Sequence, residues 1–341
     1  KNEILNSFRK RIKNEVNQEF LEAIIQVKKI ALLRLKDINK EKNMKVYDCF
    51  MYYDEDLLLD LRLNILDKYI DYFVIVESEF YHNGKKRNLK FQIKNFEKFK
   101  NKIIYISQKK EPEGILKLNE NDDEGTKSYK LIFNAHLREN EQRNQIEYGI
   151  SSAEDNDLIL ISDVDEIPNL NSVNLKKISN KIMMFEQDIF YYKFNRYLPN
   201  FTWYGTKGCR KKFLKKPQWL RNIKSKRFPF WRVDTLFSET KYIDKFYIKN
   251  GGWHFSNVKK FEDIELKLKS YLHHRDYEVE ELGLDKIEDL VNKNETIYDM
   301  FGDKTSKKYG DDKRKKLEKY EFDNLPKFIK QNKDRLKEWI D

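Results

Sequence analysis

Two aspartates, Asp163 and Asp165, directly follow the apolar run 158–161. Four consecutive aliphatic residues are typical of a strand buried on both faces, and ligands of open α/β sheets bind at the carboxyl ends of such strands. Side chains alternate along a strand, so both carboxylates can point to the same side. Paired carboxylates suit Mn²⁺ or Mg²⁺, which commonly bridge to a diphosphate. The pattern predicts a metal-dependent enzyme that uses a nucleotide-linked substrate.

The stretch 251–256 contains paired glycines followed by Trp253 and His254. Paired glycines allow close backbone approach, and the tryptophan beside them can form an apolar platform for a sugar or a base. The imidazole of His254 can complete the ligand shell of a Mn²⁺ ion. The alternative is a tight turn with a packed tryptophan and a hydrogen-bonded histidine.

Three further charged residues lie near these predicted strands. Glu77 ends the other apolar strand, 73–76, and would face the same crevice as Asp163 if the two strands were neighbours; otherwise it is a carboxylate in water. Arg138 and Arg143 lie on the helix that precedes the metal-binding strand. They are five positions apart, so they do not share one helical face well. One could reach a phosphate while the other forms a surface ion pair.

An aromatic and basic stretch, 203–231, includes Lys207 and Arg221 and shows little periodicity. We predict a set of loops that cover a site. Mixed aromatic and cationic side chains suit a sugar acceptor and a pyrophosphate. The alternative is a lid that is packed by its own aromatic residues.

The elements that must position these residues alternate between strands and helices from residue 44 onward. Apolar runs predict strands at 46–53, 72–77, 103–106, 158–161, 189–194 and 242–248. Helical patterns lie between the first four of them, so we expect an α/β fold with a mixed, mostly parallel sheet flanked by helices.

Two helical extensions are predicted, which divides the chain into segments 1–43, 44–300 and 301–341. In the first, apolar residues recur at every fourth position from Ile4 to Ile24. This helix could pack on the main domain, pair with a second copy in a homodimer, or lie on a membrane surface as a peripheral contact. The last segment is rich in lysine and partly helical.

Composition narrows the class of protein. The chain has 341 residues, 14% aromatic residues and a formal charge of +11, which fits a folded protein attracted to a polyanion, an acidic membrane or a phosphorylated substrate. No recognisable nucleic-acid motif accompanies the charge, so nucleic acid is not expected as a partner. Two cysteines make no disulfide framework, and no apolar run is long enough to span a membrane, so we expect a cytoplasmic protein.

Several segments together resemble glycosyltransferase family 17, the family of the bisecting N-acetylglucosaminyltransferase. They are 46–55, 71–78, 138–143, 161–168 and 252–256, in the order found in that family. The resemblance implies a GT-A fold, a Rossmann-like sheet with an Asp-x-Asp metal site. It implies an inverting hexosyl transfer, of N-acetylglucosamine or a related hexose, from a UDP-sugar to a glycan or glycoconjugate. The Asn-, Lys- and Ile-rich composition is typical of an AT-rich microbial or viral gene, so the N-glycan acceptor is not carried over.

By this likeness Asp163, Asp165 and His254 would hold Mn²⁺ or Mg²⁺ against the donor diphosphate. The residues expected to line the donor site are Phe50, Glu77, Arg138, Arg143, Lys207, Arg221 and Trp253. An inverting transfer also needs a carboxylate as general base. Glu239 and Asp234, in the acceptor-side stretch, are candidates by position only. A nucleotidyltransferase and a non-catalytic glycan-binding protein remain as alternatives, although the first strand lacks the glycine-rich phosphate loop expected of a nucleotidyltransferase.

Overall fold

The computed structural model describes residues 2–42, 44–171, 173–228, 231–241, 243–297 and 314–341. The chain divides into two compact units, Lys1–Met44 and Lys45–Asp341. The first is a single helix, α1 (Asn2–Lys42), in agreement with the apolar periodicity of this segment. Its Phe20 and Ile24 are exposed. None of the described helices combines the length and the apolar character that a membrane crossing requires.

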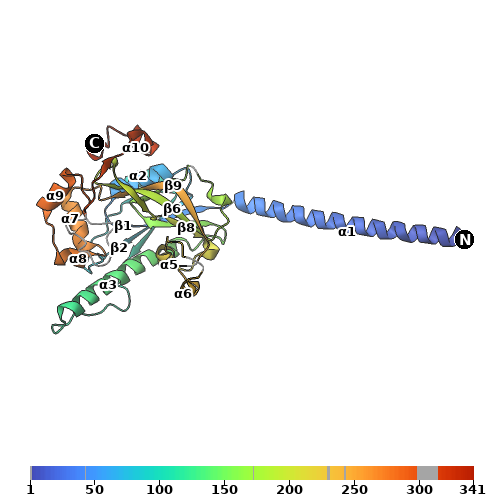
Figure 1. Cartoon of the computed structure of the whole chain (residues 1–341), viewed down its shortest axis with the longest axis horizontal. Helices are drawn as coiled ribbons and strands as arrows, with labels where there is room; N and C mark the ends of the chain where they lie inside the picture. The colour runs from blue at the N-terminus through green and yellow to red at the C-terminus, as the bar shows by residue number, and fades with distance from the viewer. Residues whose placement is uncertain (1, 43, 172, 229–230, 242, 298–313) are drawn as a thin grey trace. The chain divides into compact units, whose positions relative to one another are not determined.

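The second unit is built on a mixed sheet, which Figure 1 shows at its centre. The main path of the sheet runs in the order β10 (Glu318–Lys319), β7 (Arg196–Trp203), β6 (Ile182–Tyr191), β8 (Lys207–Arg210), β4 (Leu158–Asp163), β1 (Val46–Tyr52), β2 (Tyr72–Ser78) and β3 (Ile103–Gln108). Strand β9 (Lys245–Ser256) pairs with β6 and with β5 (Glu166–Pro168). The pairings of β1 with β2, β1 with β4, β2 with β3 and β6 with β9 are parallel, and each is longer than any antiparallel pairing among the described strands.

Helices flank this sheet, which confirms the predicted α/β class. They are α2 (Asp56–Leu66), α3 (Glu124–Asn144), α4 (Ile146–Gly149), α5 (Pro217–Asn222), α6 (Val233–Leu236), α7 (Phe261–Ser270), α8 (His274–Val279), α9 (Leu284–Asn292) and α10 (Lys327–Gln331). Short 3₁₀ turns lie at Ile93–Phe99, Leu175–Lys177, Lys211–Phe213, Phe322–Asn324 and Lys337–Trp339. Helix α7 packs against α8 and α9, and Figure 1 shows the three as one group.

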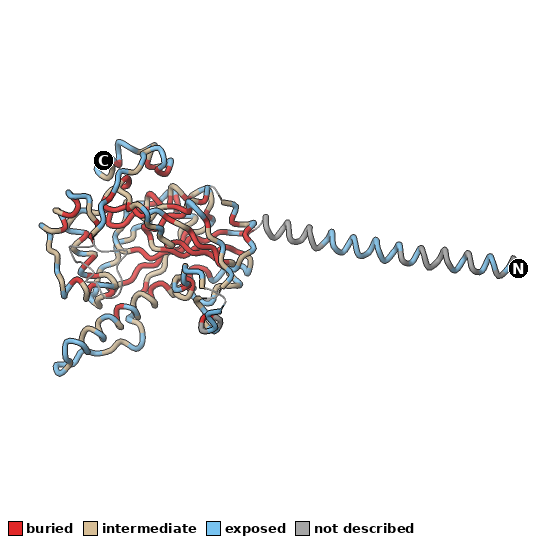
Figure 2. Tube along the Cα trace, in the orientation of Figure 1, coloured by how far each residue is buried: buried red, intermediate tan, exposed pale blue. Residues whose placement is uncertain are grey.

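The core lies along the central strands, which Figure 2 shows as the buried part of the second unit. All seven residues of β1 are buried, and so are Leu158–Ile161 of β4. Both cysteines, Cys49 and Cys209, are free thiols in this core. Burial on both faces explains why these strands read as continuous apolar runs rather than as alternating patterns.

The structure differs from the predicted elements in several places, and it adds the strands β5, β7 and β10. The stretch 203–231 contains strand β8, which pairs antiparallel with β4, and helix α5 as well as loops. The pattern hid β8 because it is short and begins with a lysine. Strands β6 and β9 begin or end several residues beyond the predicted limits. The predicted boundary at residues 300 and 301 lies outside the described residues; from Arg314 onward the chain belongs to the second unit, where β10 pairs with β7.

Candidate active site

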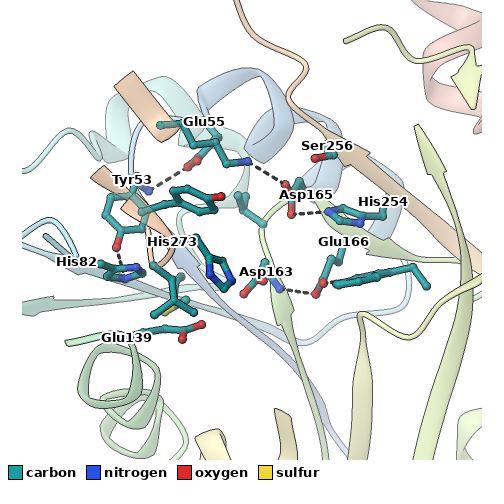
Figure 3. A pocket seen from close by; sticks show the side chains of 16 residues that line it. Tyr53, Glu55, His82, Glu139, Asp163, Asp165, Glu166, His254, Ser256 and His273 are labelled. Atoms are coloured by element: carbon teal, nitrogen blue, oxygen red, sulfur yellow. Dashed lines mark hydrogen bonds and ion pairs between the residues drawn. The ribbon is translucent and has the colours of Figure 1, made fainter. Parts of the chain in front are cut away.

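A cavity of about 480 Å³ opens at the carboxyl ends of the parallel strands. Met51, near the end of β1, pairs with Asp163 at the end of β4, so the loops after these strands meet here. Figure 3 shows Tyr53, Glu55 and His82 on one side of this cavity and Asp165, Glu166 and His254 on the other. We call it the first cavity.

The loop after β4 is held in place by a buried arginine on α2. Arg62 forms an ion pair with Asp48 at 2.6 Å, and both side chains are fully buried. The same guanidinium donates to the backbone oxygens of Asp163 and Glu166, at 3.0 and 2.9 Å. Since a buried, charged donor requires acceptors, these bonds fix the conformation of the aspartate loop. Sequence reasoning missed Arg62, which reads as an ordinary charged residue of an amphipathic helix.

The two aspartates of this loop have different partners. Asp163 accepts from Arg143 of α3 at 3.0 Å and from Arg221 of α5 at 2.9 Å, so both carboxylate oxygens are bound. Burial raises the pKa of Asp163, but the charges of Arg221 and Arg143 outweigh it and hold the pKa below its usual range. Through these two ion pairs Asp163 links helix α3 to helix α5 at the carboxyl end of β4.

Asp165 faces His254 instead. Its Oδ1 lies 3.6 Å from His254 Nε2, and its Oδ2 lies 3.5 Å from Lys267 Nζ of α7. Burial raises the pKa of Asp165, but His254 and Lys267 lower it to a net value well below the ordinary one. Burial lowers the pKa of His254, but the charge of Asp165 reverses this and leaves it raised. The two groups thus stabilise each other's charged forms.

Strand β9 brings His254 to this position. In the antiparallel pairing of β5 with β9, His254 lies opposite Glu166 and Gly252 lies opposite Pro168. Gly252 has φ +136°, and a Cβ there would clash with the backbone oxygen of Ile167. A glycine is therefore required for β9 to approach the aspartate loop so closely.

Asp165 and His254 fit a divalent cation that is shared with a diphosphate. A carboxylate oxygen and an imidazole nitrogen suit Mn²⁺, and the atoms that face each other are Asp165 Oδ1 and His254 Nε2. A cation there would replace the proton that His254 otherwise carries toward Asp165. Among the residues that the structure describes, no three His, Cys, Asp or Glu side chains gather into a complete cation site. The remaining ligands would have to be phosphate oxygens and water, as is usual for such ions at phosphate-binding sites.

A second cavity, of about 650 Å³, adjoins the first. Glu139, Trp203 and Leu272 line both cavities. The other polar side chains of the second cavity include Arg143, Lys207, Gln218, Arg221 and Asn222. The two cavities are therefore adjacent, with the carboxylate of Glu139 between them, and together they can hold two substrate groups side by side.

Two basic residues of the second cavity are engaged with the protein. Arg221 donates to both oxygens of Glu166, a fully buried carboxylate that also accepts from Trp203 Nε1 at 2.6 Å. Lys207 donates to the backbone oxygens of Arg221 and Ile223. Burial lowers the pKa of Lys207 to about 7. These bonds make the wall of the cavity rigid.

Glu139, at the junction of the two cavities, was not among the predicted site residues. It lies one helical turn before Arg143 on α3 and accepts from it at 3.0 Å. Burial raises the pKa of Glu139, but Arg143 and His82 outweigh burial and leave it below the usual value. Glu139 is therefore ionised at neutral pH. The spacing of four residues to Arg143 was the signal that could have identified it.

A buried polar group closes the first cavity near Tyr53. The hydroxyl of Tyr53 contacts His82 Nε2 and donates to Gln142 at 3.1 Å. Burial lowers the pKa of His82 to about 4, so its imidazole is neutral at physiological pH. The guanidinium of Arg87 lies over the ring of Tyr53, 5.0 Å from its centroid, and Glu55 lines the same cavity, so this wall combines an aromatic ring with charged groups.

The structure does not bring every predicted residue to these cavities. Glu77 is buried and accepts from Arg87, Tyr105 and two backbone amides, and β1 lies between its strand and β4. Arg138 pairs with Glu111 at 2.8 Å. Phe50 is a core residue under the guanidinium of Arg62.

The two candidate bases and Trp253 also lie elsewhere. Trp253 pairs with Ile167 and Asp188 in the sheet and does not line either cavity. Glu239 pairs with Lys215 at 2.7 Å, and its side chain is 68% exposed. Asp234 lies in α6, and its side chain is outside the described part of the chain. Asp163, Asp165, Arg143, Lys207, Arg221 and His254 are the predicted residues that the two cavities bring together.

The model of glycosyltransferase family 17 matches residues 18–339, which identifies the protein as a glycosyltransferase. The chain belongs to that family, which confirms the resemblance seen in its motifs. No curated protein matches the chain. Two solved structures show weak similarity to this chain.

HddC from Yersinia pseudotuberculosis is 11% identical over 61% of this chain and 91% of that chain, with a TM-score of 0.28. The inositol-1-phosphate CTP transferase from T. maritima is 12% identical over 72% of this chain and 96% of that chain, with a TM-score of 0.29. Neither likeness is close enough to inform the fold or the activity.

Proposed function

We propose that this glycosyltransferase moves a hexose, such as N-acetylglucosamine, from a UDP-sugar to a hydroxyl of a glycan or glycoconjugate, with inversion and with a divalent cation. The observation that carries the proposal is the convergence of Asp165 and His254, 3.6 Å apart, at the carboxyl edge of the parallel strands. A carboxylate and an imidazole held together in this way suit a cation bound to a nucleotide diphosphate.

In this scheme the first cavity binds the nucleoside diphosphate. The ring of Tyr53 lies at one end of the cavity, and the Asp165–His254 pair lies at the other. The ammonium group of Lys267, close to Asp165, would contact a diphosphate oxygen. These groups match an aromatic base at one end of the ligand and an anion at the other.

The second cavity then receives the two sugars. Its polar side chains, such as Gln218 and Asn222, suit hydroxyl groups, and Trp203 offers an apolar surface at the junction. Arg143 and Arg221 are anchored through Asp163, so they lie in fixed positions beside the first cavity. Fixed cations there stabilise negative charge that develops on the leaving diphosphate.

Glu139 is the proposed general base. It lines both cavities, so an acceptor hydroxyl in the second cavity can approach a donor sugar within its reach. The acceptor oxygen forms a bond to the anomeric carbon while the bond from that carbon to the diphosphate breaks. The diphosphate leaves with the electron pair, and the hydroxyl proton passes to the Glu139 carboxylate. A divalent cation bound by Asp165 and His254 would supply further neutralisation of the leaving group.

The test is isothermal titration of the full chain with UDP and UDP-sugars, each with and without Mn²⁺, followed by product analysis. We expect UDP to bind at least about tenfold more tightly with Mn²⁺ present, because the cation and the diphosphate share ligands. Turnover should release UDP. Binding that is indifferent to Mn²⁺ would overturn the metal assignment, and release of pyrophosphate would instead indicate a nucleotidyltransferase.

A further inference from the structure

The cationic charge of the chain is concentrated in one stretch. No Asp or Glu occurs between Asp188 and Asp234, whereas this stretch holds thirteen lysines and arginines. The net charge of the whole chain is +11, so subtracting these thirteen charges leaves the rest at −2. This stretch is therefore a strongly basic part of the chain, and it can contribute to long-range attraction to an anionic partner.

Large apolar side chains are exposed at the end of the same stretch. Trp231, Val233 and Phe237 are 68%, 60% and 86% exposed, and they lie within seven positions of one another on and beside helix α6. Trp219 Nε1 of α5 donates to the backbone oxygen of Glu239, three residues after α6, at 3.1 Å. Exposed aromatic residues grouped this closely mark an interaction site rather than an ordinary surface.

The segment that displays them lies between α5 and β9, and we call its described residues, 223–228, 231–241 and 243–244, the α5–β9 connection. Backbone and side-chain hydrogen bonds anchor several of these residues to the domain. The amide of Lys224 donates to the backbone oxygen of Thr240 at 2.9 Å, and the hydroxyl of Tyr247 donates to the backbone oxygen of Ser225. Ile223 and Thr235 are buried. The exposed aromatics therefore project from an anchored segment.

Exposed cations accompany the aromatics in the α5–β9 connection. Lys224, Lys226 and Arg227 are exposed, and Arg227 also stacks over the ring of Tyr247 at 4.8 Å. Tryptophan and phenylalanine favour the headgroup region of a bilayer, and lysine and arginine favour its anionic lipids. We propose that the α5–β9 connection docks this protein on an anionic membrane surface.

This docking has a consequence for the acceptor. Ile223, Lys224 and Ser225 line the second cavity, so the connection begins at the cavity wall. A membrane bound there would place the mouth of the cavity close to the lipid headgroups. The acceptor would then be a lipid-linked glycan; this last step rests on the proposed function, whereas the docking does not.

The test is flotation of the full chain with vesicles of phosphatidylcholine alone and with vesicles rich in phosphatidylglycerol. We expect binding only to the anionic vesicles, with release in high salt. The double variant Trp231→Ala/Phe237→Ala should lose at least about tenfold in partitioning. The matched control is Tyr148→Ala/Val279→Ala, whose parent side chains are 68% and 71% exposed, and it should bind like the wild type.

A second measurement guards against misfolding of the double variant. Brominated phosphatidylglycerol should quench tryptophan fluorescence of the wild type more than that of Trp231→Phe. Three results would overturn the proposal: equal binding by the Trp231→Ala/Phe237→Ala variant, equal binding to neutral vesicles, or capture by a soluble acidic polysaccharide or a second copy of the chain in place of vesicles. UDP binding without vesicles should be the same in all variants, so failure of the docking is distinct from failure of the transfer mechanism.

Discussion

Asp165 and His254 lie 3.6 Å apart, Oδ1 to Nε2, although one follows β4 and the other lies on β9. The neighbouring Asp163 makes no such contact, because both of its oxygens bind arginines. The two aspartates of one short motif therefore have separate tasks. In the proposed mechanism Asp165 binds the cation, whereas Asp163 holds two arginines beside it.

The first prediction concerns the cation. Asp165→Asn and His254→Ala should each remove the enhancement of UDP binding by Mn²⁺ and lower the transfer rate at least about 100-fold. Titration calorimetry measures the binding and UDP release measures the rate. His273→Ala is the control, because His273 lines the same cavity but is exposed. Unchanged Mn²⁺ dependence in His254→Ala would rule out the imidazole as a ligand.

Asp163 should affect stability as well as activity. Asp163→Asn leaves Arg143 and Arg221 without one charged partner, so the free energy of unfolding should fall by about 1–3 kcal/mol. Asp54→Asn is a matched control, since its side chain is 39% exposed against 37% for Asp163 and it pairs with a single lysine. Urea denaturation compares them. An equal, small loss in both variants would contradict the organising role of Asp163.

The base assignment predicts a selective loss of rate. Glu139→Gln should lower kcat about 10²–10⁴-fold while leaving the affinity for UDP nearly unchanged, because the amide cannot accept the acceptor proton. Glu141→Gln on the same helix is the control; this carboxylate accepts from Gln145 and lines neither cavity. Steady-state kinetics with saturating donor measure the effect. A kcat of Glu139→Gln close to the wild type would mean that another group takes the proton.

Stability should depend on pH through His82. Its pKa is about 4 in the folded state, below the ordinary value of 6.5, so the unfolded chain binds a proton in a range where the folded chain does not. The contribution is complete above pH 6.5 and is lost as the pH falls toward 4, by up to about 3 kcal/mol. Urea denaturation at about pH 7 and about pH 5 should show a weaker dependence in His82→Gln. The exposed His136→Gln control should keep the wild-type slope.

The approach of β9 to the aspartate loop should depend on Gly252. Gly252→Ala combines a backbone of φ +136° with a clash against Ile167, and we expect a loss of more than about 2 kcal/mol and of Mn²⁺-dependent binding. Gly283→Ala separates the two effects, because Gly283 has φ +76° and open space around its Cβ position. Thermal denaturation should show only about 1 kcal/mol for that control. If Gly252→Ala and Gly283→Ala lost similar amounts of stability, backbone strain alone would explain why position 252 requires a glycine.

Much of the parallel half of the sheet could be predicted from apolar runs. The runs at β1, β2 and β4 are continuous because both faces of these strands are buried, which is a local signal. Strand β8 gave no such signal, since its lysine is buried through hydrogen bonds to the backbone oxygens of Arg221 and Ile223, which lie in and just after helix α5. A polar residue that is satisfied only by tertiary contacts reads as a loop residue.

The sequence by itself determined the family, the α/β class and the residue types of the site: two aspartates after a buried strand, and a histidine after paired glycines. Tertiary structure decided which of these residues meet. His254 lies beside Asp165, and Asp163 pairs with two arginines. Glu77 is buried away from the cavities, and Glu139 lies at their junction. Motifs specify chemistry because side-chain type is local, whereas contacts between distant elements depend on strand order and helix packing, which no short motif encodes.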